Sequence, residues 1–109
     1  MLVMLLLIST SVSAAGISIK SVSITPSLTF NGTTANCKAT VRDAGKTISV
    51  TMELWCGSSL LGTWTNSGTN KVTVSGTYIG VQQGKTYTLK VYGTANGIGF
   101  SAAPYSKTA

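Results

Sequence analysis

The sequence of 109 residues contains no histidine and only two acidic residues, Asp43 and Glu53. Without histidine the chain cannot form a Ser-His-Asp triad, an imidazole-activated thiol or a His-containing zinc site. The two carboxylates lie too far apart along the chain to act as the acid and base of a glycoside hydrolase. Phosphate-binding glycine loops and dinucleotide fingerprints are missing as well. We therefore expect a protein that is not an enzyme, without catalytic residues, metal or cofactor.

The chain also lacks an apolar run long enough to cross a bilayer, which takes about twenty residues. Its short apolar run, Leu2 to Ile8, gives way to small residues as far as Ala14. A short apolar core followed by small residues is typical of a secretory signal peptide. We predict a signal peptide over residues 1–14 and a mature, secreted chain over residues 15–109. That length suits a single domain without a transmembrane span.

Positive charge outweighs negative charge, with eight Lys and Arg residues and a formal net charge of +6. Such a surface attracts anionic partners, including acidic glycans and cell-wall polymers. The cations are spread singly along the sequence, so we interpret them mainly as a contribution to solubility and to protection of strand edges. No run combines basic and aromatic residues, and we expect no specific binding of nucleic acid.

Alternation of apolar and polar residues with a period of two is the dominant pattern. Ile48, Val50, Met52 and Leu54 alternate with polar residues. This pattern predicts a strand with one face in a core and one in solvent. Segments 21–30, 33–41, 70–78 and 86–95 alternate in the same way. About seven antiparallel strands in a chain of roughly this length indicate an all-β sandwich of two sheets.

Two Asn-Gly pairs, at residues 31–32 and 96–97, predict two-residue hairpin turns. A turn at the first pair would place Leu28 opposite Ala35. A turn at the second pair would place Gly93 opposite Phe100, where the glycine would leave room for the aromatic ring. Inward-facing residues then meet inward-facing residues in both hairpins.

Cys37, in the middle of the second expected strand, and Tyr87, in GKTYTLKV at the start of a later strand, carry a resemblance to a known architecture. They resemble positions of the immunoglobulin and fibronectin III-like sandwiches, which implies a two-sheet sandwich over nearly the whole mature chain. The chain is also similar to small secreted sandwich proteins of Gram-positive bacteria. It departs from antibody domains at Leu89, where those domains carry the second cysteine. The resemblance is one of architecture and implies no activity.

The two cysteines, Cys37 and Cys56, both have inward parity. Exported thiol pairs usually oxidise, and a bridge between them would stabilise the fold by about 3 kcal/mol. The strand rise can also place them more than about 10 Å apart, beyond the limit of about 7 Å for a bridge. Three alternatives stay open: a Cys37–Cys56 disulfide, two separately buried thiols, or reaction with another molecule.

The aromatic residues point to recognition. Trp55 has the parity of the polar face, whereas Trp64 faces the core if the chain after Cys56 includes an odd number of loop residues. Tyr92 and Lys90 have outward parity on a strand that neighbours that of Trp55 in immunoglobulin-like sheets. Trp55, Tyr92 and Lys90 are therefore our candidate binding residues, able to stack sugar rings or anchor a protein. The alternative is that the exposed rings only stabilise their cross-strand neighbours.

Together these features indicate a secreted, non-enzymatic binding or adhesion module at a cell surface. Its expected partner is a glycan, an anionic cell-wall polymer or another protein. One alternative is a structural or self-associating secreted protein without a ligand site. A further alternative is a cationic secreted toxin. The sequence does not determine the oligomeric state.

Overall fold

The computed structural model describes residues 22–109, so the predicted signal peptide lies outside the described residues. This part of the chain forms strands and no helix, and every strand pairing is antiparallel. The all-β prediction is confirmed. None of these residues belongs to a helix with the length and hydropathy needed to cross a membrane. The six strands are β1 (Ser23–Asn31), β2 (Thr34–Cys56), β3 (Ser59–Ile79), β4 (Thr86–Ala95), β5 (Ile98–Ser101) and β6 (Tyr105–Thr108).

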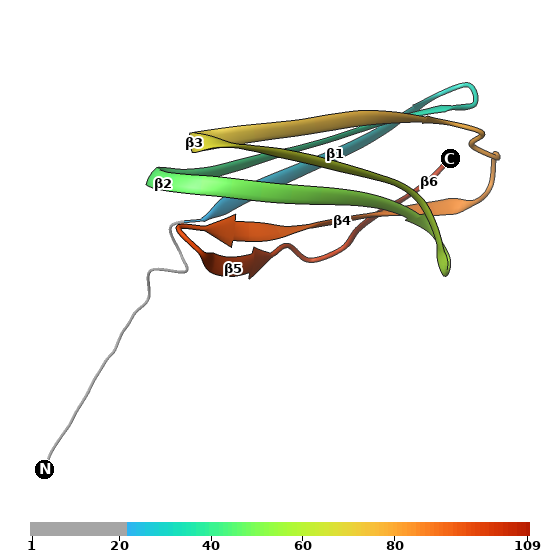
Figure 1. The fold of residues 1–109 in the computed structure, drawn as a ribbon. Helices are drawn as coiled ribbons and strands as arrows, with labels where there is room; N and C mark the ends of the chain where they lie inside the picture. Colours follow the sequence, from blue (N-terminus) through green and yellow to red (C-terminus); the bar gives the residue numbers. More distant parts are fainter. Residues whose placement is uncertain (1–21) are drawn as a thin grey trace, which may run out of the picture.

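The two long strands, β2 and β3, double back on themselves, which curls the sheet (Figure 1). In β2 the bend lies between Asp43 and Thr47, where the register shifts and Gly45 has a φ of 78°. In β3 it lies at Asn70, which has a φ of 71°. The sequence pattern treats these two bends as turns between separate strands and does not predict β6, so about seven strands were expected and six are present.

Each half of β2 has its own partners. Residues 34–43 pair with β1 and with residues 70–79 of β3. Residues 47–56 pair with residues 59–69 of β3, and within that half residues 48–55 also pair with β4. The far edge of β4 carries β5 and β6.

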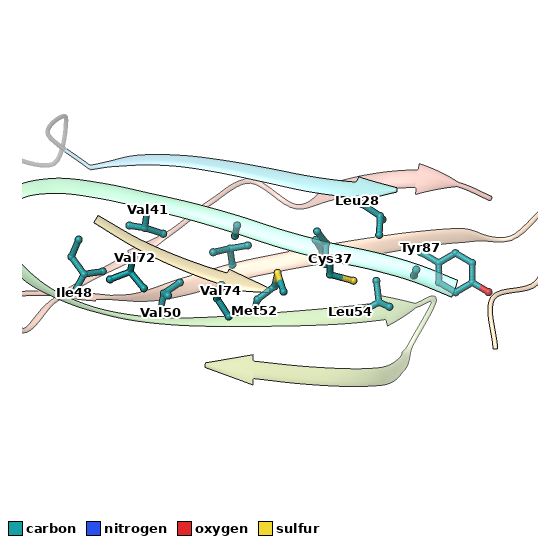
Figure 2. Packing of buried hydrophobic residues seen from close by; sticks show 14 of the residues in the cluster. Leu28, Cys37, Val41, Ile48, Val50, Met52, Leu54, Val72, Val74 and Tyr87 are labelled. Atoms are coloured by element: carbon teal, nitrogen blue, oxygen red, sulfur yellow. The ribbon is translucent and has the colours of Figure 1, made fainter. Parts of the chain in front are cut away.

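The inward faces of the two halves enclose one hydrophobic core (Figure 2). The alternation expected at residues 48–54 is confirmed, because Ile48, Val50, Met52 and Leu54 are all buried. The inward residues of the other strands join them. The buried hydrophobic residues outside that segment are Leu28, Ala35, Cys37, Ala39, Val41, Val72, Val74, Val81, Tyr87, Leu89, Val91 and Ala95.

The register predicted for the first hairpin is wrong by two residues. Leu28 pairs with Cys37 rather than Ala35, because the turn residues are Gly32 and Thr33 instead of Asn31 and Gly32. Gly32 has a φ of 62°, as the first central residue of a type II′ turn requires. The pairing changes by two residues, so every side chain keeps its predicted face.

The last hairpin has the predicted turn and register. Asn96 and Gly97 have φ values of 48° and 80°, and a type I′ turn requires positive φ at both central residues. Gly93 pairs with Phe100. The reason we gave for Gly93 was wrong, because an added Cβ would collide with the backbone carbonyl oxygen of Ser49 on β2. Glycine here allows β2 and β4 to approach closely.

Trp64 packs against the core, as expected. The loop after Cys56 has two residues, but a register shift between Leu54 and Trp55 leaves Leu61 as an extra residue in β3. The two loop residues and the bulge residue Leu61 together make an odd number of unpaired residues. Trp64 therefore lies opposite Met52 on β2 and faces the core. The indole lies over Gly76, where an added Cβ would collide with it.

Candidate functional site

The outer face formed by residues 47–56 of β2 and by β4 brings together the three candidate binding residues. Lys90 lies opposite Glu53, Tyr92 opposite Thr51 and Trp55 opposite Thr88. Trp55, Tyr92 and Lys90 therefore share one face because β2 and β4 are neighbours. We call this group, together with Glu53, the aromatic cluster.

Glu53 connects the two aromatic side chains of the cluster. Its carboxylate accepts a hydrogen bond from Trp55 Nε1 at 2.9 Å and another from the Tyr92 hydroxyl at 2.7 Å. The bonds fix the polar ends of both rings and so restrict their rotamers. From the sequence, Glu53 shares the outward parity of Trp55, but the only role weighed for it was that of a catalytic acid. Its bond to Tyr92 depends on the pairing of β2 with β4, which joins residues far apart in the sequence.

Lys90 completes the cluster with a cation–π contact. Its Nζ lies 4.5 Å from the centroid of the Trp55 ring, within the range in which the ring quadrupole attracts a cation. Trp55 is half-buried, while Tyr92 is 40% exposed. The cluster thus offers two aromatic rings, with one cation over the ring of Trp55.

The same contacts change two pKa values. Hydrogen bonds from Trp55 and from Tyr92 lower the pKa of Glu53, and the charge of Lys90 adds a smaller effect in the same direction. The bond to Glu53 raises the pKa of Tyr92. Because folding lowers the pKa of Glu53, ionised Glu53 stabilises the folded state. This stabilisation is fully present above the ordinary glutamate pKa and is lost as pH falls through the lower pKa of the folded state.

We therefore expect the Trp55 indole Nε1–H resonance to titrate in NMR spectra with a midpoint below the ordinary glutamate value. Protonation of Glu53 weakens both of its hydrogen bonds, and the indole resonance reports this. In Glu53→Gln the acid titration of this resonance should disappear, while the spectrum of the core stays unchanged. A midpoint at or above the ordinary value would contradict the bonded geometry.

An open hollow of about 720 Å³ lies on the same face beside Tyr92. Its rim is polar because outward positions of β2, β3 and β4 are hydroxyl or amide residues. Sequence reasoning did not single these residues out, since each alone reads as an ordinary solvent-facing position of a strand. They are Ser49, Thr51, Thr65, Asn66, Ser67 and Thr94.

Both cysteines are free thiols in the structure. Cys37 lies in the core, where burial raises its pKa to about 11, so it stays protonated and unreactive at neutral pH. Cys56 is half-buried at the end of β2 and lines a small hollow with Tyr78 and Tyr87. The structure has no disulfide between Cys37 and Cys56, and of the two thiols only that of Cys37 is fully buried.

The two acidic residues lie on opposite sides of the sheet. Asp43 is 2% exposed, and its Oδ2 lies 3.5 Å from Lys46 Nζ, whereas Glu53 belongs to the outer aromatic cluster. Within residues 22–109 no three side chains of His, Cys, Asp or Glu gather in a way that could hold a metal ion.

The fold and this surface define an antiparallel all-β protein with an outward aromatic cluster beside a polar hollow. Comparison with protein-family models, with curated proteins and with solved structures gives no match.

Proposed function

We propose that this chain is an immunoglobulin or fibronectin III-like sandwich. Two observations support this. The strand pairings divide into one group around residues 34–43 and another around residues 47–56, as in a two-layer sandwich. The Tyr87 hydroxyl also accepts a hydrogen bond of 2.8 Å from the backbone N–H of Gln82, five residues upstream. A tyrosine near the start of strand F makes such a bond in these folds.

We propose further that the protein is a secreted, non-enzymatic module that binds a glycan at a cell surface. The observation that carries this is the pair of hydrogen bonds by which Glu53 holds Trp55 and Tyr92 beside the polar hollow. Rings held in place lose little conformational entropy when a ligand binds. Sugar rings have C–H faces that pack on aromatic rings, and hydroxyls that suit a rim of Ser, Thr and Asn.

The polar rim favours a glycan over a protein partner. Protein-binding surfaces usually concentrate burial in an apolar centre, whereas the rim beside Tyr92 consists mainly of hydroxyl and amide groups. Lys90 adds a charge that suits a carboxylate or phosphate on the ligand. Secretion, proposed from the residues that precede Ala15, would bring this face to extracellular polysaccharide.

Trp55→Ala and Tyr92→Ala are each expected to weaken glycan binding by about 1 kcal/mol or more, roughly fivefold in Kd. Folding should be nearly unchanged, because both rings lie on the outer face. Calorimetry with a glycan selected from an array measures the first effect and thermal unfolding the second. Ile79→Ala is the matched control, because Ile79 is 74% exposed on β3 and lies outside the cluster.

Self-association is the second candidate, and the short edge strand β5 favours it. Ile98 at the start of this strand is 63% exposed, and unpaired strand edges with apolar residues can pair with another copy. In that case Ile98→Lys should shift the protein toward monomer on a sizing column. Loss of glycan binding in Trp55→Ala with an unchanged elution volume would instead support the glycan site.

A further inference from the structure

The outer face of the other half of the sheet carries positive charge. It consists of β1, residues 34–43 of β2 and residues 70–79 of β3. Arg42 on β2 lies directly opposite Lys71 on β3. Lys38 has the same parity as Arg42, and all three side chains are exposed. At a rise of about 3.3 Å per residue, Lys38 lies about 13 Å from Arg42 along the strand.

No acidic side chain balances these cations. The chain has only two acids. Asp43 is buried beside Lys46, and Glu53 is bound in the aromatic cluster. Like charges directly opposite each other in a sheet are destabilising, so the Arg42–Lys71 pair costs the free protein stability. An anion placed between them would remove that repulsion and gain two charge-assisted contacts.

A hollow of about 320 Å³ lies on this face beside Lys38. Like the hollow beside Tyr92, it is lined by groups that can donate and accept hydrogen bonds. Hydroxyl and amide side chains of all three segments contribute to it. They are Ser27, Thr29, Asn36, Ser75 and Thr77.

The outward positions of these segments carry only Ser, Thr, Asn, Lys, Arg and one Ile. Proteins that bind single-stranded nucleic acid stack the bases on aromatic rings, and this face of the described chain has none. The hydroxyl-rich surface suits sugar units instead, with the three cations spaced to meet charged groups along a polymer. These features favour an acidic polysaccharide over a nucleic acid.

We propose that Lys38, Arg42 and Lys71 form a second binding site, the cationic face, for a linear polysaccharide that carries carboxylate, sulfate or phosphate groups. The charged groups of the polymer pair with Arg42 and Lys71 at one end and with Lys38 at the other, while its hydroxyls bond to the polar rim. The cationic face lies on the other half of the sheet from the aromatic cluster and does not depend on it. A chain with both sites can connect two polysaccharides.

The test compares Arg42→Gln/Lys71→Gln with Lys85→Gln/Lys107→Gln. Both double variants lose two positive charges, but Lys85 and Lys107 are exposed outside the cationic face. Immobilised polygalacturonate and dextran sulfate serve as probes, with neutral dextran and single-stranded DNA as comparisons. The first double variant should bind the acidic probes roughly tenfold more weakly than wild type, and the second nearly as well as wild type.

Wild-type affinity for the acidic probes should also fall as salt rises, because exposed charges are screened. Arg42→Gln/Lys71→Gln should unfold at the same temperature as wild type or a higher one at low salt, which separates loss of binding from loss of folding. Both double variants keep Trp55, Tyr92 and Lys90, so a failure of the aromatic cluster to bind glycan does not change the comparison between them. Equal weakening by both double variants, or DNA binding as tight as polysaccharide binding, would overturn the proposal.

Discussion

Gly93→Ala is expected to destabilise the protein by about 3 kcal/mol. The new Cβ would collide with the carbonyl oxygen of Ser49 and would lie 2.9 Å from its carbonyl carbon and 3.0 Å from Val50 Cα. All three atoms belong to the backbone of β2, so no change of rotamer relieves the overlap. The strands β2 and β4 must move apart, which weakens both their hydrogen bonds and the packing of the core beneath them. A small domain has about 5–15 kcal/mol of stability in total.

Gly99→Ala is the matched control, because it is also a glycine of the last hairpin. The nearest atom to its added Cβ is the Gly93 carbonyl oxygen at 3.9 Å, an ordinary contact. Its stability should lie within about 0.5 kcal/mol of wild type. Urea unfolding of the three proteins measures the difference. Equal stability of Gly93→Ala and wild type would show that β2 and β4 do not approach as closely as the structure has them.

Tyr87→Ala is expected to cost about 3 to 5 kcal/mol, as other large-to-small substitutions of buried aromatics do. The residue is 2% exposed, and its ring packs at 5.6 Å between centroids against Phe30 from the first hairpin. Removing the ring leaves a cavity between β4 and β1. It also removes the hydroxyl that holds the turn before β4 through its hydrogen bond with the backbone of Gln82. Urea unfolding, followed by tryptophan fluorescence, measures the loss.

Tyr87→Phe divides that effect into its two parts. The phenylalanine keeps the ring but removes the hydroxyl that accepts from the Gln82 backbone N–H at 2.8 Å. Loss of a single partly buried hydrogen bond costs about 1 kcal/mol. Stability should therefore fall from wild type to Tyr87→Phe and again to Tyr87→Ala. Near-native stability of Tyr87→Ala would contradict the packing of this ring in the core.

The sequence alone determined most of the strands and the faces of their residues. Alternation at Ile48, Val50 and Met52 assigns a buried face because successive side chains of a strand point to opposite sides. The turn at Asn96 and Gly97 was equally predictable, since these residue types tolerate the positive φ that a type I′ turn needs. Both features depend on residues close together in the chain. The outward parity of Trp55 and Tyr92 follows from the same local rule.

Only the tertiary structure decided which of these faces lie side by side. Glu53 accepts a hydrogen bond from Tyr92, and Arg42 lies opposite Lys71, through strand pairings that join residues far apart in the sequence. The bulge at Leu61 turns Trp64 inward through a register shift that no local pattern specifies. Such contacts depend on strand order, register and bends, and these are set by the packing of the whole core. Three cations that are scattered in the sequence thus lie on one face, and a glutamate without a catalytic partner holds two aromatic rings.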